Sequence, residues 1–245
     1  MQCLENMILR LDFLSPIDIN DKLDAEVVRE ITKYYKKAEP KQLKRNVLYL
    51  SKQPIDDSKI SQQLLNDEVQ WVFNSQSGEK FTIGTNEMIL TSSLGYEKSV
   101  KDKASKVIEI IFNKYAPQLR RIGLRYINRF PNEGKDTYIN EKLLYYKDLY
   151  DGFDIDNTIS TLEIKKEINN LDAFFRINHG VVKNEELNET EKYLLDIDGF
   201  TRDTTYEFSE VIACVEEIHQ IIKKLFKDSL TDQYRGEFKW WKRVL

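Results

Sequence analysis

The side chains with the most chemical potential in this chain lie in one run near its midpoint, at positions 121–130. In a strand, alternate side chains point to opposite faces. One face of this run is mostly apolar, and the other presents Arg121, Arg125 and Arg129 beside Gly123, where a backbone or a ligand can approach closely. Guanidinium groups offer a planar fork of donors that suits carboxylates and phosphates. The run therefore predicts a row of arginines that needs acidic partners.

Acidic side chains on other predicted strands can supply these partners. Asp196 and Asp198 share one strand face, and Glu163 lies on another strand. Buried charges in proteins are normally paired. We therefore expect the arginines mainly to organise a sheet, and the alternative is that they bind an anionic ligand or a protein partner.

A second arrangement indicates an enzyme. Glu163 and Lys165 form a Glu-x-Lys pair on a predicted strand, with Asp156 upstream. Divalent-metal nucleases use an acidic residue and such a strand to hold a cation that activates water. In this alternative Asp156 and Glu163 bind the metal and Lys165 stabilises charge. Because the tripeptide arises readily in a chain with 32% charged residues, we favour a non-enzymatic binding or regulatory protein that recognises a protein partner or a small anionic ligand. In this interpretation the chain has no catalytic residue, metal or cofactor.

The remaining residue types give no catalytic signature. His179 and His219 belong to no cluster with metal-ligand spacing. Cys3 and Cys214 are the only cysteines, so the sequence contains no disulfide framework. The sequence also lacks a P-loop, a dinucleotide-binding glycine motif and a nucleophile elbow.

The C-terminal tail carries Trp240 and Trp241 between two lysines. Tryptophan is a favoured anchor at protein interfaces and can also stack on single-stranded bases. More often such a tail folds back on its own core. The candidate residues for binding a ligand or partner are Arg121, Arg125, Tyr126, Asn128, Arg129, Trp240 and Trp241.

Composition limits the class of protein. The 245 residues are 41% hydrophobic and carry a formal net charge of −4, which indicates a soluble globular protein. Without an overall basic field, nucleic acid is not a favoured partner, so a nucleic-acid-binding subunit that uses the sheet as a saddle is only an alternative. The N-terminus does not resemble a signal peptide, and no apolar run is long enough to span a membrane. We expect a cytoplasmic protein with no membrane association.

The order of expected elements occurs twice. The first half is predicted to form strands at 7–13, 45–50, 68–74, 80–85 and 87–94, with helices from Asp24 to about Ala38 and from Ser99 to just before Pro117. The second half is predicted to form strands at 121–130, 158–168, 173–182 and 192–200, with helices at 140–150 and 208–227. Short matches, such as residues 9–11 with 124–126, support an internal duplication.

The predicted fold class is therefore α+β. Residues 1–119 and 120–245 form two repeats of strand, helix, antiparallel strands and helix, whose sheets join as one structural domain. An antiparallel sheet of this kind carries its helices on one face. By analogy with TATA-binding-protein-like and helix-grip folds, we expect a curved sheet.

The segment Arg121-Ile-Gly-Leu-Arg-Tyr-Ile-Asn128 resembles the central signature of a sporadically distributed prokaryotic family of about this length and of unknown function. The resemblance extends from an N-terminal strand to a late Leu-Leu-Asp-Ile-Asp strand. It implies that Arg121, Gly123, Arg125, Tyr126 and Asn128 are marked positions, and it supplies no activity. The patchy distribution of that family favours an accessory role in a prokaryotic defence or toxin–antitoxin system.

Overall fold

The computed structural model of this chain describes most of it. The described residues are 3–19, 23–35, 37–43, 68–75, 77–140, 143, 159–168, 171–182, 191–202, 206 and 208–237.

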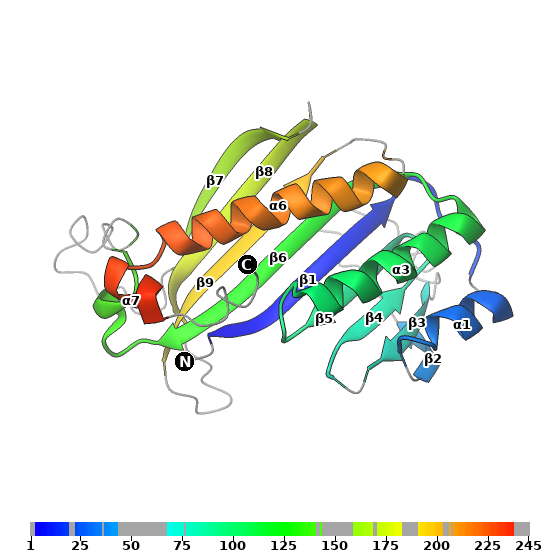
Figure 1. Cartoon of the computed structure of the whole chain (residues 1–245), viewed down its shortest axis with the longest axis horizontal. Helices are drawn as coiled ribbons and strands as arrows, with labels where there is room; N and C mark the ends of the chain where they lie inside the picture. Colours follow the sequence, from blue (N-terminus) through cyan, green and yellow to red (C-terminus); the bar gives the residue numbers. More distant parts are fainter. Residues whose placement is uncertain are drawn as a thin grey trace, which may run out of the picture.

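In the described part of the chain, nine strands form one curved sheet in which every neighbouring pair is antiparallel (Figure 1). In sheet order they are β2 (Lys37–Leu43), β3 (Glu68–Asn74), β4 (Lys80–Ile83), β5 (Glu87–Ser92), β1 (Leu4–Phe13), β6 (Leu119–Pro131), β9 (Lys192–Thr201), β8 (Leu171–Val182) and β7 (Ile159–Ile168). The sheet is not closed, since β2 and β7 are its two edges among the described strands. Pairing between β1 and β6 joins the strands of the two halves of the chain.

Two long helices, α3 (Lys98–Tyr115) and α6 (Phe208–Asp228), lie on the same face of the sheet (Figure 1). The shorter helices among the described residues are α1 (Ala25–Ile31), α7 (Asp232–Glu237) and the 3-10 turn η1 (Lys135–Thr137). The core lies between the helices and the sheet, because the apolar stripes of α3 and α6 are buried against alternate residues of the strands. No helix in the described part of the chain combines the length and the apolar character that a membrane crossing needs.

Helix α6 lies very close to the sheet at Gly199 on β9. A Cβ atom at this position would lie 2.7 Å from Cγ2 of Ile218 on α6 and 2.8 Å from Cε1 of Phe175 on β8. Contacts this short do not occur between real Cβ atoms and their neighbours. Glycine at position 199 therefore sets the spacing between α6 and the sheet.

The expected α+β class, with an antiparallel sheet and helices on one face, is confirmed.

Asp24 caps α1 as predicted, because its carboxylate accepts hydrogen bonds from the backbone N–H groups of Glu26 and Val27. The prediction that this helix continues to about Ala38 is wrong. The helix ends at Ile31, and β2 then pairs along its whole length with β3. Pro40 is tolerated there because β2 is an edge strand.

Most other predicted elements agree with the structure, and two fall outside the described residues. Strand β3 has the predicted bounds, and strands β1 and β4 to β9 and helices α3 and α6 agree with their predictions within a few residues, whereas strand β2 was not predicted. The expected strand at 45–50 lies outside the described residues, as does nearly all of the expected helix at 140–150.

Candidate functional site

The central strand β6 divides its side chains between two environments, as its alternation predicts. Its apolar set lies buried beneath the helices, whereas Arg121, Arg125 and Arg129 point to the opposite side of the sheet. We call that opposite side the open face, since none of the described helices lies on it (Figure 1). The three arginines meet different surroundings there.

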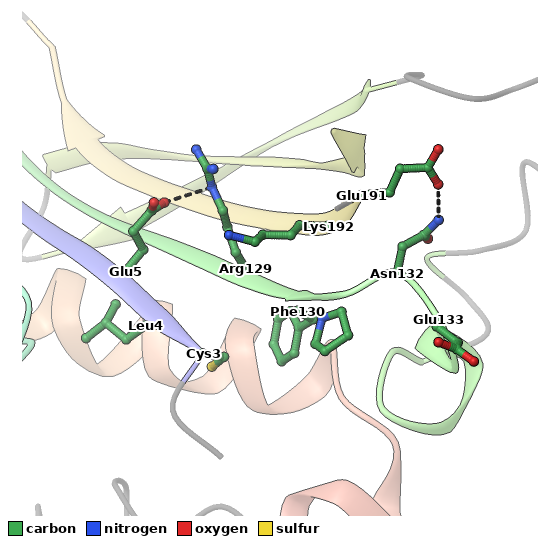
Figure 2. Close-up of a pocket in the computed structure, with 10 residues that line it drawn as sticks. Cys3, Leu4, Glu5, Arg129, Phe130, Asn132, Glu133, Glu191 and Lys192 are labelled. Atoms are coloured by element: carbon green, nitrogen blue, oxygen red, sulfur yellow. Dashed lines mark hydrogen bonds and ion pairs between the residues drawn. The ribbon is translucent and has the colours of Figure 1, made fainter. Parts of the chain in front are cut away.

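Arg129 lies at a groove of about 510 Å³ at the end of the sheet where β1 begins and β6 ends (Figure 2). The groove is lined by Cys3, Leu4, Glu5, Arg129, Phe130, Pro131, Asn132, Glu133, Glu191 and Lys192. The Nε atom of Arg129 is 2.8 Å from a carboxylate oxygen of Glu5, and Glu191 accepts a hydrogen bond from Asn132. The lining carries both signs of charge. Arg129 lies at the rim of the groove and is already paired with Glu5.

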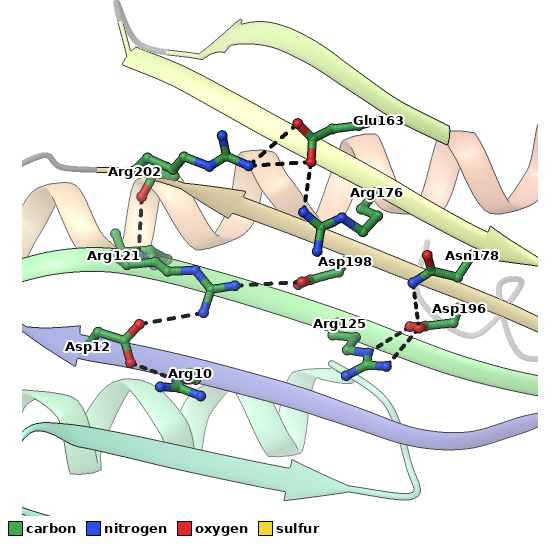
Figure 3. Close-up of polar contacts among 12 residues, drawn as sticks. Arg10, Asp12, Arg121, Arg125, Glu163, Arg176, Asn178, Asp196, Asp198 and Arg202 are labelled. Atoms are coloured by element: carbon green, nitrogen blue, oxygen red, sulfur yellow. Dashed lines mark hydrogen bonds and ion pairs between the residues drawn. The ribbon is translucent and has the colours of Figure 1, made fainter. Parts of the chain in front are cut away.

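Arg125 forms the best-defined ion pair of the open face (Figure 3). Its Nε and Nη2 groups donate to the two oxygens of Asp196 at 2.8 and 2.7 Å, which is the bidentate geometry that guanidinium favours. Asn178 donates a third hydrogen bond to the same carboxylate at 3.0 Å. The hydrogen bond to Asp196 raises the pKa of Arg125 above its ordinary value. The side chain of Asp196 is only 3% exposed, so Arg125 has one of the acidic partners that the sequence led us to expect.

Arg121 lies over Gly123 on its own strand. A Cβ at Gly123 would be 3.3 Å from Nη2 of Arg121, so the space beside the glycine is filled by this guanidinium. The guanidinium also stacks on Phe200 with its Cζ 4.8 Å from the ring centroid, and it contacts Asp12 at 3.5 Å and Asp198 at 3.6 Å. Burial raises the pKa of Asp198, although Arg121 opposes that shift. The absence of a side chain at Gly123 therefore makes room for the guanidinium of Arg121 on the same strand.

The ion-pair network continues onto β1 and β5 through Arg10, which sequence reasoning did not select. Its Nε is 2.6 Å from Asp12, and its Nη2 is 2.7 Å from Glu87. Asp12 thus bridges Arg10 and Arg121 across two strands (Figure 3). The alternation of arginine and aspartate on β1 was the signal that could have identified this site.

At the other end of the open face, Glu163 on β7 contacts two arginines. Arg176 on β8 donates to it at 2.9 Å, and Arg202, just after β9, lies 3.4 Å away (Figure 3). Lys165 on β7 is 2.5 Å from Asp172 on β8. The nuclease alternative stays a prediction, because its third residue, Asp156, lies outside the described residues.

Tyr126 and Asn128 lie on the helix-covered face, as the strand alternation predicts. The Tyr126 hydroxyl is 2.9 Å from Nδ1 of His219 on α6. Burial raises the pKa of Tyr126 well above its ordinary value and lowers that of His219 to about 4. Asn128 accepts from the Cys3 thiol and donates to the carbonyl oxygen of Leu195 at 3.2 Å. Both residues therefore bond to other parts of the core, away from the open face.

Trp240 and Trp241, the two candidates in the tail, lie outside the described residues.

The described geometry defines an α+β protein whose open sheet face carries a charge-balanced network of arginines and carboxylates. Five arginines and five carboxylates make up this network: Arg10, Arg121, Arg125, Arg176, Arg202, Asp12, Glu87, Glu163, Asp196 and Asp198. No protein-family model matches the chain, and no curated protein matches it in sequence.

Proposed function

We propose that this protein is a non-enzymatic binding module that docks a protein partner on its open face. The observation that carries the proposal is the exposure of arginines that carboxylates already hold in place. Arg10, Arg125, Arg176 and Arg202 are each between 42% and 45% exposed. Arginine is enriched at protein interfaces, and a prepositioned side chain loses less conformational entropy on binding.

Apolar side chains on the same face support a protein partner. Ile8 on β1, Ile89 on β5 and Ile127 on β6 are half-buried residues of the three adjacent central strands. Their side chains alternate with the buried set, so they point to the open face. A surface that mixes aliphatic side chains with half-exposed arginines has the composition of a protein interface.

The balance of charge argues against a nucleic acid as the partner. A protein that binds the sugar-phosphate backbone of a nucleic acid needs a continuous positive surface. On the open face every arginine of the network has a carboxylate partner within 4 Å, and these carboxylates would repel phosphates. A protein surface with both signs of charge fits this face better.

We also propose that residues 1–119 and 120–245 are two copies of one ancestral repeat, arranged as in TATA-binding-protein-like folds. The strand order supports this proposal. From the centre outward it runs β1-β5-β4-β3-β2 on one side and β6-β9-β8-β7 on the other. In both halves a long helix follows the strand that pairs with the central one, namely α3 after β5 and α6 after β9.

The resemblance of residues 121–128 to a patchily distributed prokaryotic family extends the proposal to the cellular role. We infer an accessory of a defence or toxin–antitoxin system whose partner is encoded beside it. The test is quantitative co-purification from cells that carry the gene and its neighbours.

The open-face variant for this test is Ile8→Lys with Ile127→Lys. The matched control is Ile221→Lys, which changes a half-buried isoleucine on α6, away from the open face. A neighbouring gene product that the wild type and the control retain, and that the open-face variant loses about tenfold or more, supports the proposal. Equal recovery with all three proteins would place the docking surface elsewhere.

A further inference from the structure

The carboxylate of Glu163 lies between two arginines at one end of the open face, and the two hold it unequally. Arg176 Nη2 donates to its Oε2 at 2.9 Å, whereas Arg202 Nη2 lies 3.4 and 3.5 Å from its two oxygens. Charge-assisted bonds of this kind are normally 2.7–2.9 Å long. Arg202 therefore holds this carboxylate more weakly than Arg176 does.

Asp196 shows how a permanently held carboxylate on the same face differs. It receives two short bonds from Arg125 and one from Asn178, and its side chain is 3% exposed. The side chain of Glu163 is 36% exposed and belongs to β7, an edge strand that pairs only with β8 among the described strands. Rotation of the Glu163 side chain into water thus breaks no backbone pairing and leaves no buried charge.

Aromatic rings hold the two arginines in place independently of Glu163. The Cζ of Arg202 lies 4.2 Å from the centroid of Phe174, and that of Arg176 lies 5.6 Å from the centroid of Phe200. The two rings stack on each other with centroids 5.9 Å apart. Stacking of guanidinium on aromatic faces is favourable. The arginines therefore keep their positions when the carboxylate leaves.

We propose that Arg176 and Arg202 form a clamp for one carboxylate side chain of the protein partner, and that Glu163 occupies this clamp in the free protein. This inference rests on the proposed docking function and specifies its chemistry. Binding exchanges one carboxylate for another, so the clamp accepts the same group that it already holds. Asp198, which lies opposite Arg176 in the pairing of β8 with β9, disfavours a ligand with several phosphates.

The test measures binding of a short blocked glutamate peptide, with its glutamine counterpart as the ligand control. The proteins are the wild type, Glu163→Gln and Asp172→Asn. Asp172 pairs with Lys165 on the same hairpin, so its variant removes the same amount of negative charge without opening the clamp. An exposed ion pair stabilises modestly, so Glu163→Gln is expected to bind the peptide about two- to fivefold tighter than the wild type. Asp172→Asn is expected to bind like the wild type.

A double variant tests whether the gain in peptide binding depends on the clamp. Arg176→Gln added to Glu163→Gln is expected to remove the gain, with thermal melting used to show that each variant is folded. Equal gains for Glu163→Gln and Asp172→Asn would overturn the clamp, because the effect would then be general charge. The proposal also fails if Glu163→Gln gives no gain, or if inorganic phosphate binds and the peptide does not. These failures leave the co-purification result with Ile8 and Ile127 unaffected, so the two proposals are tested separately.

Discussion

Replacement of Arg125 by methionine is expected to destabilise the fold strongly while leaving its architecture unchanged. The substitution removes two bonds of 2.8 and 2.7 Å from Asp196, whose carboxylate then stays buried with Asn178 as its one remaining side-chain partner among the described residues. Removing one member of a buried ion pair costs about 3–5 kcal/mol. Because Arg125 itself is 44% exposed and water can reach its place, we expect the lower end, about 3 kcal/mol.

Urea unfolding followed by circular dichroism measures this cost, and thermal melting is expected to shift down by about 6–12 °C for a chain of this size. The double variant Arg125→Met with Asp196→Leu replaces the pair by apolar groups, and it is expected to recover most of the lost stability. Lys165→Met is the control, since it breaks an exposed pair with Asp172 and should cost less than about 1 kcal/mol. A cost below about 1 kcal/mol for Arg125→Met, or a double variant less stable than both single variants, would refute a structural role for this pair.

Three further predictions concern the core and the open face. Gly199→Ala is expected to destabilise the protein by about 1–3 kcal/mol in urea unfolding, because the new Cβ would lie 2.7 Å from Ile218; an unchanged midpoint would contradict this close approach. Burial lowers the pKa of His219 from 6.5 to about 4, so the unfolded chain binds its proton first and stability falls as the pH drops between those values, by up to about 3 kcal/mol. In His219→Asn this part of the pH dependence should be absent, and identical profiles would refute the assignment. Gly123→Ala is expected to push Arg121 off its aromatic partner and to shift the Nε resonance of that arginine in NMR spectra; an unmoved resonance would show that the glycine is not required for its placement.

Local patterns were sufficient to predict much of the fold. The alternation of residues 121–130 predicted which side chains of β6 are buried, and apolar spacing predicted α3 and α6. These predictions succeed because side-chain direction depends on the period of the local backbone alone. The same reasoning overextended the helix that begins at Ala25, since segment 37–43 becomes a strand only through its pairing with β3.

The sequence by itself determined that three arginines share one strand face and need partners. Only the tertiary structure decided which carboxylates meet them. Strand order and register bring Asp12 and Asp198 to Arg121 from opposite sides, and they place Arg202 beside Glu163. The space at Gly123, open to a ligand on sequence grounds, is filled by Arg121. The reason is physical: burial of one sheet face selects the register of distant strands, and that register then decides the contacts on the other face.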